Sequence, residues 1–187
     1  MYPDWEVQKL GDFMSIPDKI QATKIDKNKL LTVKLHLKGV IKNDCTESLS
    51  AKGTVYYVRR KGQFIFGKQN LFNGAFGFIP DKYDGFLSSN DVPTLDINLE
   101  KINPLYILYY IGRRNYYMPL ENIAIGSGSK RIHEPAVLNL EIAVPILEEQ
   151  TAIVSIINSI DKKIEIEASV FLGLSLQKKY LLSNIFV

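Results

Sequence analysis

The stretch that decides the fold runs from residue 144 to residue 161 and reads VPILEEQTAIVSIINSID. Pro145 fixes the backbone φ angle and ends the apolar run before it. Glu148 and Glu149 then place negative charge in the first turn of a helix, where the helix dipole favours it. After Pro145 the sequence holds no further proline and a single glycine, Gly173. A strand therefore ends here and one long helix begins, so the motif is interpreted as structural rather than catalytic.

An apolar stripe follows this helix in steps of alternately four and three residues, which is typical of a coiled coil. Only Glu167 and Lys178 interrupt it. A helix of roughly 40 residues extends on the order of 60 Å, beyond the width of a domain this small, so its far end is expected to pair with another helix. The alternative is that the helix folds back across its own sheet. The expected seam consists of Ile153, Ile157, Ile160, Ile164, Phe171, Leu174, Leu181 and Ile185.

The sequence before the helix predicts a globular domain with a twisted, mostly antiparallel sheet. Its apolar segments are short, and turn signals such as Asn73-Gly74 and Asp84-Gly85 separate them. A short helix is expected over residues 104–113. The fold class is thus α+β, with a globular domain over 1–145 and one long C-terminal coiled-coil helix over 146–187. The expected strands are Leu30–Leu37, Thr54–Val58, Gln63–Phe66, Ala75–Ile79, Val92–Ile97 and Ile142–Pro145.

Composition limits the function classes. The 187 residues, 46% of them hydrophobic, suffice for one core. The formal net charge of +3 is too small to identify a nucleic-acid partner, but residues 146–187 carry four lysines against five acidic residues, which leaves +4 on residues 1–145. A lone Cys45 argues against an internal disulfide or a zinc cluster, and no apolar run is long enough to span a bilayer. We therefore expect a cytoplasmic protein without a membrane partner or metal.

The residues around Pro145 resemble the specificity subunits of type I restriction-modification enzymes. The resemblance rests on Pro145 followed by Glu149-Gln150, on Ile160-Asp161 and on the ending KYLLSNIF at residues 179–186. Trp5–Asp12 also resembles the opening of their target recognition domains. Full-length members of that family carry two recognition domains and two such helices packed antiparallel, whereas this sequence has one of each. It is identified as the single-domain, half-subunit form, either a natural half-subunit or an excised fragment.

The resemblance implies a non-catalytic subunit that binds double-stranded DNA. Two domains held apart by helices, one from each copy of a homodimer, would read the two halves of a bipartite target, and two-fold symmetry would make those halves inverted repeats. The helix is expected to dock methyltransferase (M) subunits, and through them the restriction (R) subunits. No cofactor is expected in this chain, since S-adenosylmethionine and ATP belong to those partner subunits.

DNA contacts are expected from exposed loops that combine cations with amides, because cations hold phosphate and amides or arginine read base edges. For Arg59 and Arg60 the alternative to DNA binding is a solvated hairpin tip. For Arg113 and Arg114 the alternative is that they neutralise carbonyl groups at a helix C-terminus. Tyr116-Tyr117 are expected to pack in the domain. The candidate residues are Lys68, Gln69, Asn70 and Asn73 in one loop, Ser127, Ser129, Lys130 and Arg131 in a second, Arg59 and Arg60 beside Lys61, and Arg113 and Arg114.

Three features could instead suggest an enzyme. Asn103–Tyr106 resembles the Asn-Pro-Pro-Tyr signature of adenine methyltransferases, with leucine at the second proline, and is interpreted as a helix start. Pro80-Asp81 with Asp161–Lys163 could suit a metal-dependent nuclease, but the second element lies on the long helix. His36 and His133 are isolated from any nucleophile. A methyltransferase or nuclease fragment therefore remains an alternative, as does a non-catalytic protein-interaction module.

Overall fold

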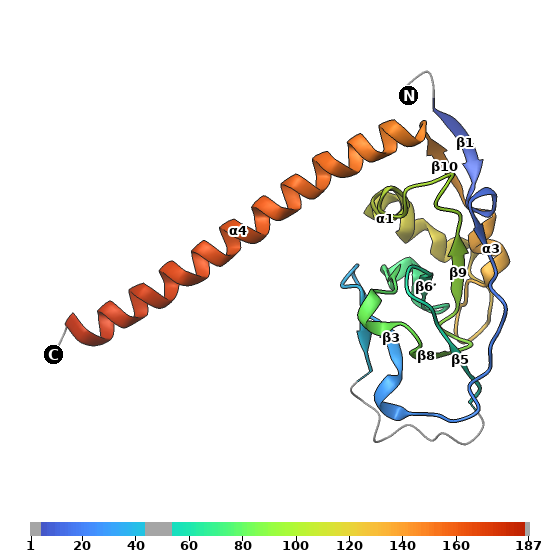
Figure 1. Ribbon diagram of the computed structural model, residues 1–187, viewed down its shortest axis with the longest axis horizontal. Coiled ribbons are helices and arrows are strands. Elements are labelled where there is room, and N and C mark those ends of the chain that lie inside the picture. The colour runs from blue at the N-terminus through green and yellow to red at the C-terminus, as the bar shows by residue number, and fades with distance from the viewer. Residues whose placement is uncertain (1–4, 44–53, 186–187) are drawn as a thin grey trace.

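The computed structural model describes residues 5–43 and 54–185. Within them a domain of short strands carries one helix that projects far beyond it (Figure 1). Cys45, for which no disulfide or zinc ligation was expected, lies outside the described residues.

Every strand pair in the described chain is antiparallel. Four strands form one sheet in the order β2-β9-β6-β7, and three further pairs are β1-β10, β3-β4 and β5-β8. The predicted α+β class is confirmed, although the strands are divided among several small sheets. The strands are β1 (Glu6–Lys9), β2 (Met14–Ser15), β3 (Leu31–Val33), β4 (Val40–Lys42), β5 (Tyr56–Val58), β6 (Phe64–Phe66), β7 (Phe76–Phe78), β8 (Leu87–Ser89), β9 (Thr94–Ile97) and β10 (Glu141–Val144).

The α-helices of the described chain all follow β9 in sequence. Asn103 begins the first of them, because its side-chain oxygen accepts a hydrogen bond from the Leu105 N–H at 3.0 Å and Pro104 follows at the first helical position. This confirms the helix-start interpretation of Asn103–Tyr106. The helices are α1 (Pro104–Ile111), α2 (Arg114–Tyr117), α3 (Glu134–Leu138) and α4 (Leu147–Ile185), with 3-10 turns at Leu10–Asp12, Lys27–Lys29, Leu71–Asn73, Asp81–Tyr83 and Met118–Ile123.

The strand expected over Leu30–Leu37 ends at Val33. His36 and Leu37 adopt left-handed φ angles of 59° and 58°, which turn the chain back into β4, a strand that the sequence did not predict. The backbone N–H groups of His36 and Leu37 donate to the carbonyls of Asn73 and Gly74, each at 2.9 Å. Two non-glycine residues in this conformation carry strain, so the contact with Asn73-Gly74 is what imposes the turn.

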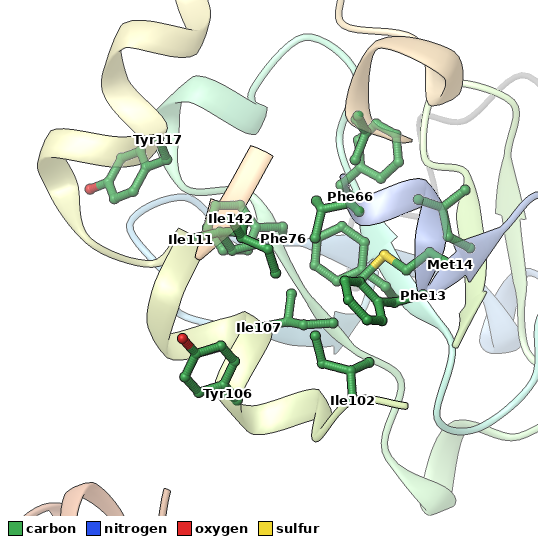
Figure 2. Packing of buried hydrophobic residues seen from close by; sticks show 14 of the residues in the cluster. Phe13, Met14, Phe66, Phe76, Ile102, Tyr106, Ile107, Ile111, Tyr117 and Ile142 are labelled. Carbon is green, nitrogen blue, oxygen red and sulfur yellow. The ribbon is translucent and has the colours of Figure 1, made fainter. Parts of the chain in front are cut away.

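Phenylalanines of the sheet and isoleucines of α1 form the main core. Phe66, Phe76, Ile102 and Ile107 belong to one cluster of buried side chains (Figure 2), and all four are fully or almost fully buried. Burying a side chain of this size contributes on the order of 1.5–3 kcal/mol. The core therefore fixes α1 on the sheet, and α1 in turn supports the start of α4.

The junction between domain and helix is buried. The side chain of Gln150 is 1% exposed; its oxygen accepts from the Asn103 N–H at 2.8 Å, and its amide donates to the Pro145 carbonyl at 2.9 Å. Val154, 5% exposed, belongs to the main core. On the other side β1 pairs with β10 and so holds the strand that leads into Pro145. The first turns of α4 therefore pack as part of the domain.

Beyond these turns α4 leaves the domain. The hydroxyl of Tyr109 lies 2.7 Å from Asn158 Oδ1 and 2.8 Å from Asp161 Oδ2, at the surface of the helix. Every residue from Asn158 to Ile185 is exposed, and the helix runs away from the domain in Figure 1. The alternative in which the helix folds back over its own sheet is therefore wrong.

The length of α4 does not make it a membrane span. Among residues 5–43 and 54–185, no helix combines the length and the apolar character that crossing a bilayer requires.

Two truncations test where the folded domain ends. A chain ending at Asp161 keeps Gln150 and Val154 and, at a protein concentration low enough for the full chain to be monomeric, should unfold at the same denaturant concentration as the full chain. A chain ending at Pro145 should lose about 3 kcal/mol or more of the free energy of unfolding, since it loses Val154 from the core and the hydrogen bonds of Gln150. Urea unfolding followed by circular dichroism measures both. Equal stability of the two fragments would contradict the packing of the first turns.

Candidate nucleic-acid interface

The expectation that Lys68 reaches DNA from an exposed loop is wrong. Its side chain is buried, and its ammonium lies 3.0 Å from the carboxylate of Glu134, at the first position of α3. A buried charge that already has a buried counter-ion is not available to a phosphate. In the same loop Asn70 is exposed, while Gln69 and Asn73 are half-buried.

The same correction applies to Arg59. Its side chain is 4% exposed, and its guanidinium donates to Ser88 Oγ at 2.7 Å, to Thr94 Oγ1 at 3.2 Å and to two backbone carbonyls of the turn over residues 89–92. Burial lowers the pKa of Arg59 to about 10, against the opposing effects of Tyr57 and Glu134. Arg59 therefore ties β5 to the turn after β8 rather than binding phosphate. Its neighbour Arg60 is exposed.

The remaining cationic candidates are on the surface. Arg113 stacks 3.9 Å above the ring of Tyr110 and donates to the Tyr110 carbonyl at 2.8 Å, which fits the alternative of a cation at the C-terminus of α1. Lys130 forms an exposed ion pair with Glu121 at 2.9 Å. Their role in DNA binding stays a prediction, as does that of Arg114, Ser127, Ser129 and Arg131, which the structure places at the surface or half-buried.

The aromatic residues after Arg114 pack in the domain, as expected. Tyr117 is buried, and its ring meets that of Phe76 in a T-shaped contact, with the centroids 6.0 Å apart. The hydroxyl of Tyr116 donates to the Glu141 carbonyl at 2.7 Å. Both rings are therefore engaged within the domain rather than offered to a base.

Two of the predicted loops lie side by side. The Lys68 N–H donates to Asp91 O, and the Ile132 N–H donates to Lys68 O, each at 2.9 Å. Arg131 Nε lies 3.3 Å from Asp91 Oδ1. The loop over 67–74 and the loop over 126–131 therefore meet through the turn that Arg59 anchors.

A third loop, which the sequence analysis missed, joins them. The turn over 34–39 is bonded to Asn73-Gly74, and a hollow of about 260 Å³ is lined by Thr32 and Val33 together with Gln69 and Asn70. We call the loops over 34–39, 67–74 and 126–131 the distal loops. In Figure 1 the chain leading into the first of them runs across the end of the domain opposite the start of α4, and the turn over 34–39 itself lies beside α1, with which it lines a hollow.

That leading segment is strongly basic. Residues 16–43 hold seven lysines against two aspartates, a net charge of +5 that exceeds the +3 of the whole chain. All seven except the half-buried Lys42 are exposed, and within the described part of the chain only Lys19 of the seven forms an ion pair. A charge count over a window of about 30 residues would have found it. The lysines are Lys19, Lys24, Lys27, Lys29, Lys34, Lys38 and Lys42.

Glu134 connects the basic segment to the distal loops. Its carboxylate lies 3.0 Å from Lys68 and 3.9 Å from Lys19. Burial raises the pKa of Glu134, but hydrogen bonds from its own backbone N–H and from Lys68, with the charges of Lys68 and Lys19, outweigh burial and hold the pKa below its ordinary value of 4.5. The carboxylate is therefore charged at neutral pH and positions both segments.

The basic segment and the distal loops carry groups suited to binding an anionic polymer. Exposed lysines on the basic segment can hold phosphates, and the side chains of Gln69 and Asn70 offer donors and acceptors for base edges. Among the described residues, no three His, Cys, Asp or Glu side chains come together in a way that could hold a metal ion.

Comparison with known proteins gives a family for this arrangement. The family model of the type I restriction modification DNA specificity domain matches residues 2–170. A curated relative, the specificity subunit of the type I restriction enzyme MjaVIII from Methanocaldococcus jannaschii, is 35% identical over 68 residues, which are 36% of this chain and 16% of the relative.

Solved structures share the fold. The HsdS subunit from Thermoanaerobacter tengcongensis superposes with a TM-score of 0.64 at 17% identity, over 97% of this chain and 48% of that one. The S subunit from M. genitalium gives 0.57 at 16% identity, over 96% and 46%. A chain from a structure of the complex assembly and conformational transition of the type I R-M system gives 0.60 at 18%, over 96% and 47%. The chain thus spans about half the length of these solved subunits.

Replacing Glu134 tests its buried ion pair with Lys68. Glu134→Gln should lower the free energy of unfolding at pH 7 by about 3 kcal/mol, because it leaves the Lys68 ammonium buried without a counter-ion. Since the folded pKa is depressed, the stabilisation from Glu134 is complete above pH 4.5 and is lost as the pH falls through the folded pKa. The variant and the natural protein should therefore converge in acid. Urea unfolding from pH 7 to pH 3 measures this.

Glu121→Gln is the matched control, since it removes the exposed partner of Lys130. It should cost less than about 1 kcal/mol at every pH. Equal losses for the two variants would contradict a buried, pH-dependent role for Glu134.

Proposed function

Because this chain belongs to the family of type I restriction modification DNA specificity domains, we propose that it is the DNA-reading subunit of a type I restriction-modification complex and reads one half of a bipartite target. The observation that carries the proposal is the combination of one recognition domain with one helix whose apolar seam is exposed from Ile160 to Ile185. In this proposal a second copy supplies the other half. Two-fold symmetry then makes the target a gapped inverted repeat.

The basic segment and the distal loops form the DNA-binding surface in this proposal. The lysines of residues 16–43 bind phosphates and so contribute affinity without sequence preference. Gln69 and Asn70, on the loop over 67–74, contact base edges. Support for this division comes from their placement, because the turn that carries Lys34 and Lys38 is hydrogen-bonded to the loop that carries the two amides.

A second apolar stripe on α4 is proposed to dock the methyltransferase subunits. Leu172, Leu176 and Tyr180 follow one another at four-residue spacing, and each is more than 60% exposed. They lie on a different face from the seam over Ile160–Ile185, so one helix can pair with a second copy and still present an apolar surface. The restriction subunits would join through the methyltransferase subunits.

The proposal assigns no catalytic step to this chain. S-adenosylmethionine and ATP would be bound by the partner subunits, and the complex would act on DNA in the cytoplasm. The chain's own contribution is to select the site and to fix the spacing between its halves.

Selection from random duplex DNA tests the proposal and identifies the target at the same time. The purified chain should enrich two short inverted elements at a fixed separation. Enrichment of one ungapped element would contradict the bipartite reading. Failure to enrich any sequence, with no salt-dependent binding, would favour a protein-interaction module.

Point variants divide the surface into its two roles. Lys34→Ala, Lys38→Ala and Lys130→Ala should each weaken binding evenly across sequences and lower the slope of log affinity against log salt by about 0.9 for each lost phosphate contact. Gln69→Ala and Asn70→Ala should change the preferred sequence. Lys162→Ala, an exposed lysine on α4, is the control and should change neither quantity. Fluorescence anisotropy with the selected duplex at several salt concentrations measures both.

The docking stripe has its own test. Leu176→Asp should abolish copurification of the methyltransferase subunit, because it places a charge in the middle of the second apolar stripe, and should leave DNA binding by the isolated chain unchanged. Glu165→Asp is a matched control on the same helix. Unchanged copurification of the Leu176 variant would contradict docking on this face.

A further inference from the structure

The seam of α4 is apolar and uncovered along most of its length. Its six apolar residues between positions 160 and 185 are 43–73% exposed, and the hydrogen bonds from the domain to this helix reach no further than Asp161. Large apolar side chains at coiled-coil spacing are stabilised by a facing helix. The six residues are Ile160, Ile164, Phe171, Leu174, Leu181 and Ile185.

Two charged residues of opposite sign break the seam. Glu167 and Lys178 occupy seam positions, and both are exposed. Neither forms an ion pair within residues 5–43 and 54–185, and they are too far apart along one helix to pair with each other. A second helix can bring them together.

An antiparallel two-fold pairing of two copies satisfies both charges at once. If residue 167 of one copy faces residue 178 of the other, then 160 faces 185, 164 faces 181, and 171 faces 174. Every apolar seam residue from 160 to 185 then faces an apolar residue, and the symmetry forms the Glu167–Lys178 contact twice.

Neighbouring arrangements lack this match. A shift by one heptad in one direction places Lys178 opposite Ile160 and Glu167 opposite Phe171. A shift by one heptad in the other direction places Lys178 opposite Leu174 and Glu167 opposite Ile185. A parallel pair would set each charge against its own copy. Charges within an apolar seam select register and orientation by making such alternatives unfavourable.

We infer that α4 is a self-recognition element in which Glu167 of each copy pairs with Lys178 of the partner subunit, and that these two contacts fix one antiparallel register. The inference rests on the homodimer of the proposed function and specifies its geometry. With this register the two helix starts at Leu147 lie about 76 Å apart along the axis, at ~1.5 Å per residue. The same two charges therefore set the separation of the recognition domains.

Charge reversal tests the pairing. Glu167→Lys and Lys178→Glu should each weaken homodimerisation about 10- to 100-fold, because every copy then meets like charges at two places. Mixed in equal amounts, the two variants should form a heterodimer. One of its two contacts is then the natural glutamate–lysine pair, and the other is the same pair with the charges exchanged, so no like charges meet. The double variant Glu167→Lys/Lys178→Glu should dimerise within a few fold of the natural chain. Sedimentation velocity on full chains measures all of these.

Glu165→Lys and Lys179→Glu are the matched controls, because they reverse charges on the same helix outside the seam; they should leave dimerisation unchanged. If the single variants dimerise as well as the natural chain, or if the double variant does not restore association, the proposed pairing is overturned although the homodimer stands. A natural chain that stays monomeric overturns the homodimer and the pairing together.

Cysteine cross-linking tests the register independently. In a Cys45→Ser background, a mixture of Ile164→Cys and Leu181→Cys chains should form a mixed disulfide, because these positions face each other. A mixture of Ile157→Cys and Leu181→Cys chains should not. The reverse result would show the register shifted by one heptad and would overturn the Glu167–Lys178 contact.

Discussion

The buried side chain of Gln150 joins the helix to the domain, and the rest of the architecture depends on this junction. It bonds to the backbone on both sides, at Asn103 and at Pro145, so the direction of α4 follows from the position of α1 and β10. Because α1 is itself packed on the sheet through Ile107, the helix direction is fixed by the main core. A helix held in this way can fix the distance between two domains, whereas a flexible junction would let that distance vary.

The distal loops are held by a different kind of interaction. Arg59 and the pair Lys68–Glu134 place charges in the interior, where each has its hydrogen-bond partners, and so hold together loops that would otherwise be independent. The lysines of the basic segment stay at the surface, as do Arg60 and Lys130. Buried charges thus give the distal loops their shape, while exposed charges provide the attraction for DNA that we propose.

Local patterns made much of the fold predictable, and long-range contacts account for what was missed. Pro145 and the spacing of Ile160 and Ile164 predicted the long helix, because helical periodicity is a property of neighbouring residues. The exposure of Arg59 and Lys68 was predicted wrongly, since their burial depends on partners far along the chain. The turn at residues 36–37 depends on hydrogen bonds to the carbonyls of Asn73 and Gly74, and the sequence around Leu37 contains no turn signal that would predict it. The basic segment was missed because charge was counted over the whole domain.

The mass of the full chain in solution tests the central claim. This claim is that the exposed seam of a rigidly held helix pairs two copies of the chain into a two-fold symmetric DNA-binding dimer. Light scattering over a range of concentrations should give twice the 21.2 kDa of one chain, falling towards 21.2 kDa only on dilution. A mass of 21.2 kDa at every concentration would contradict the account, because the seam would then have no second copy to cover it.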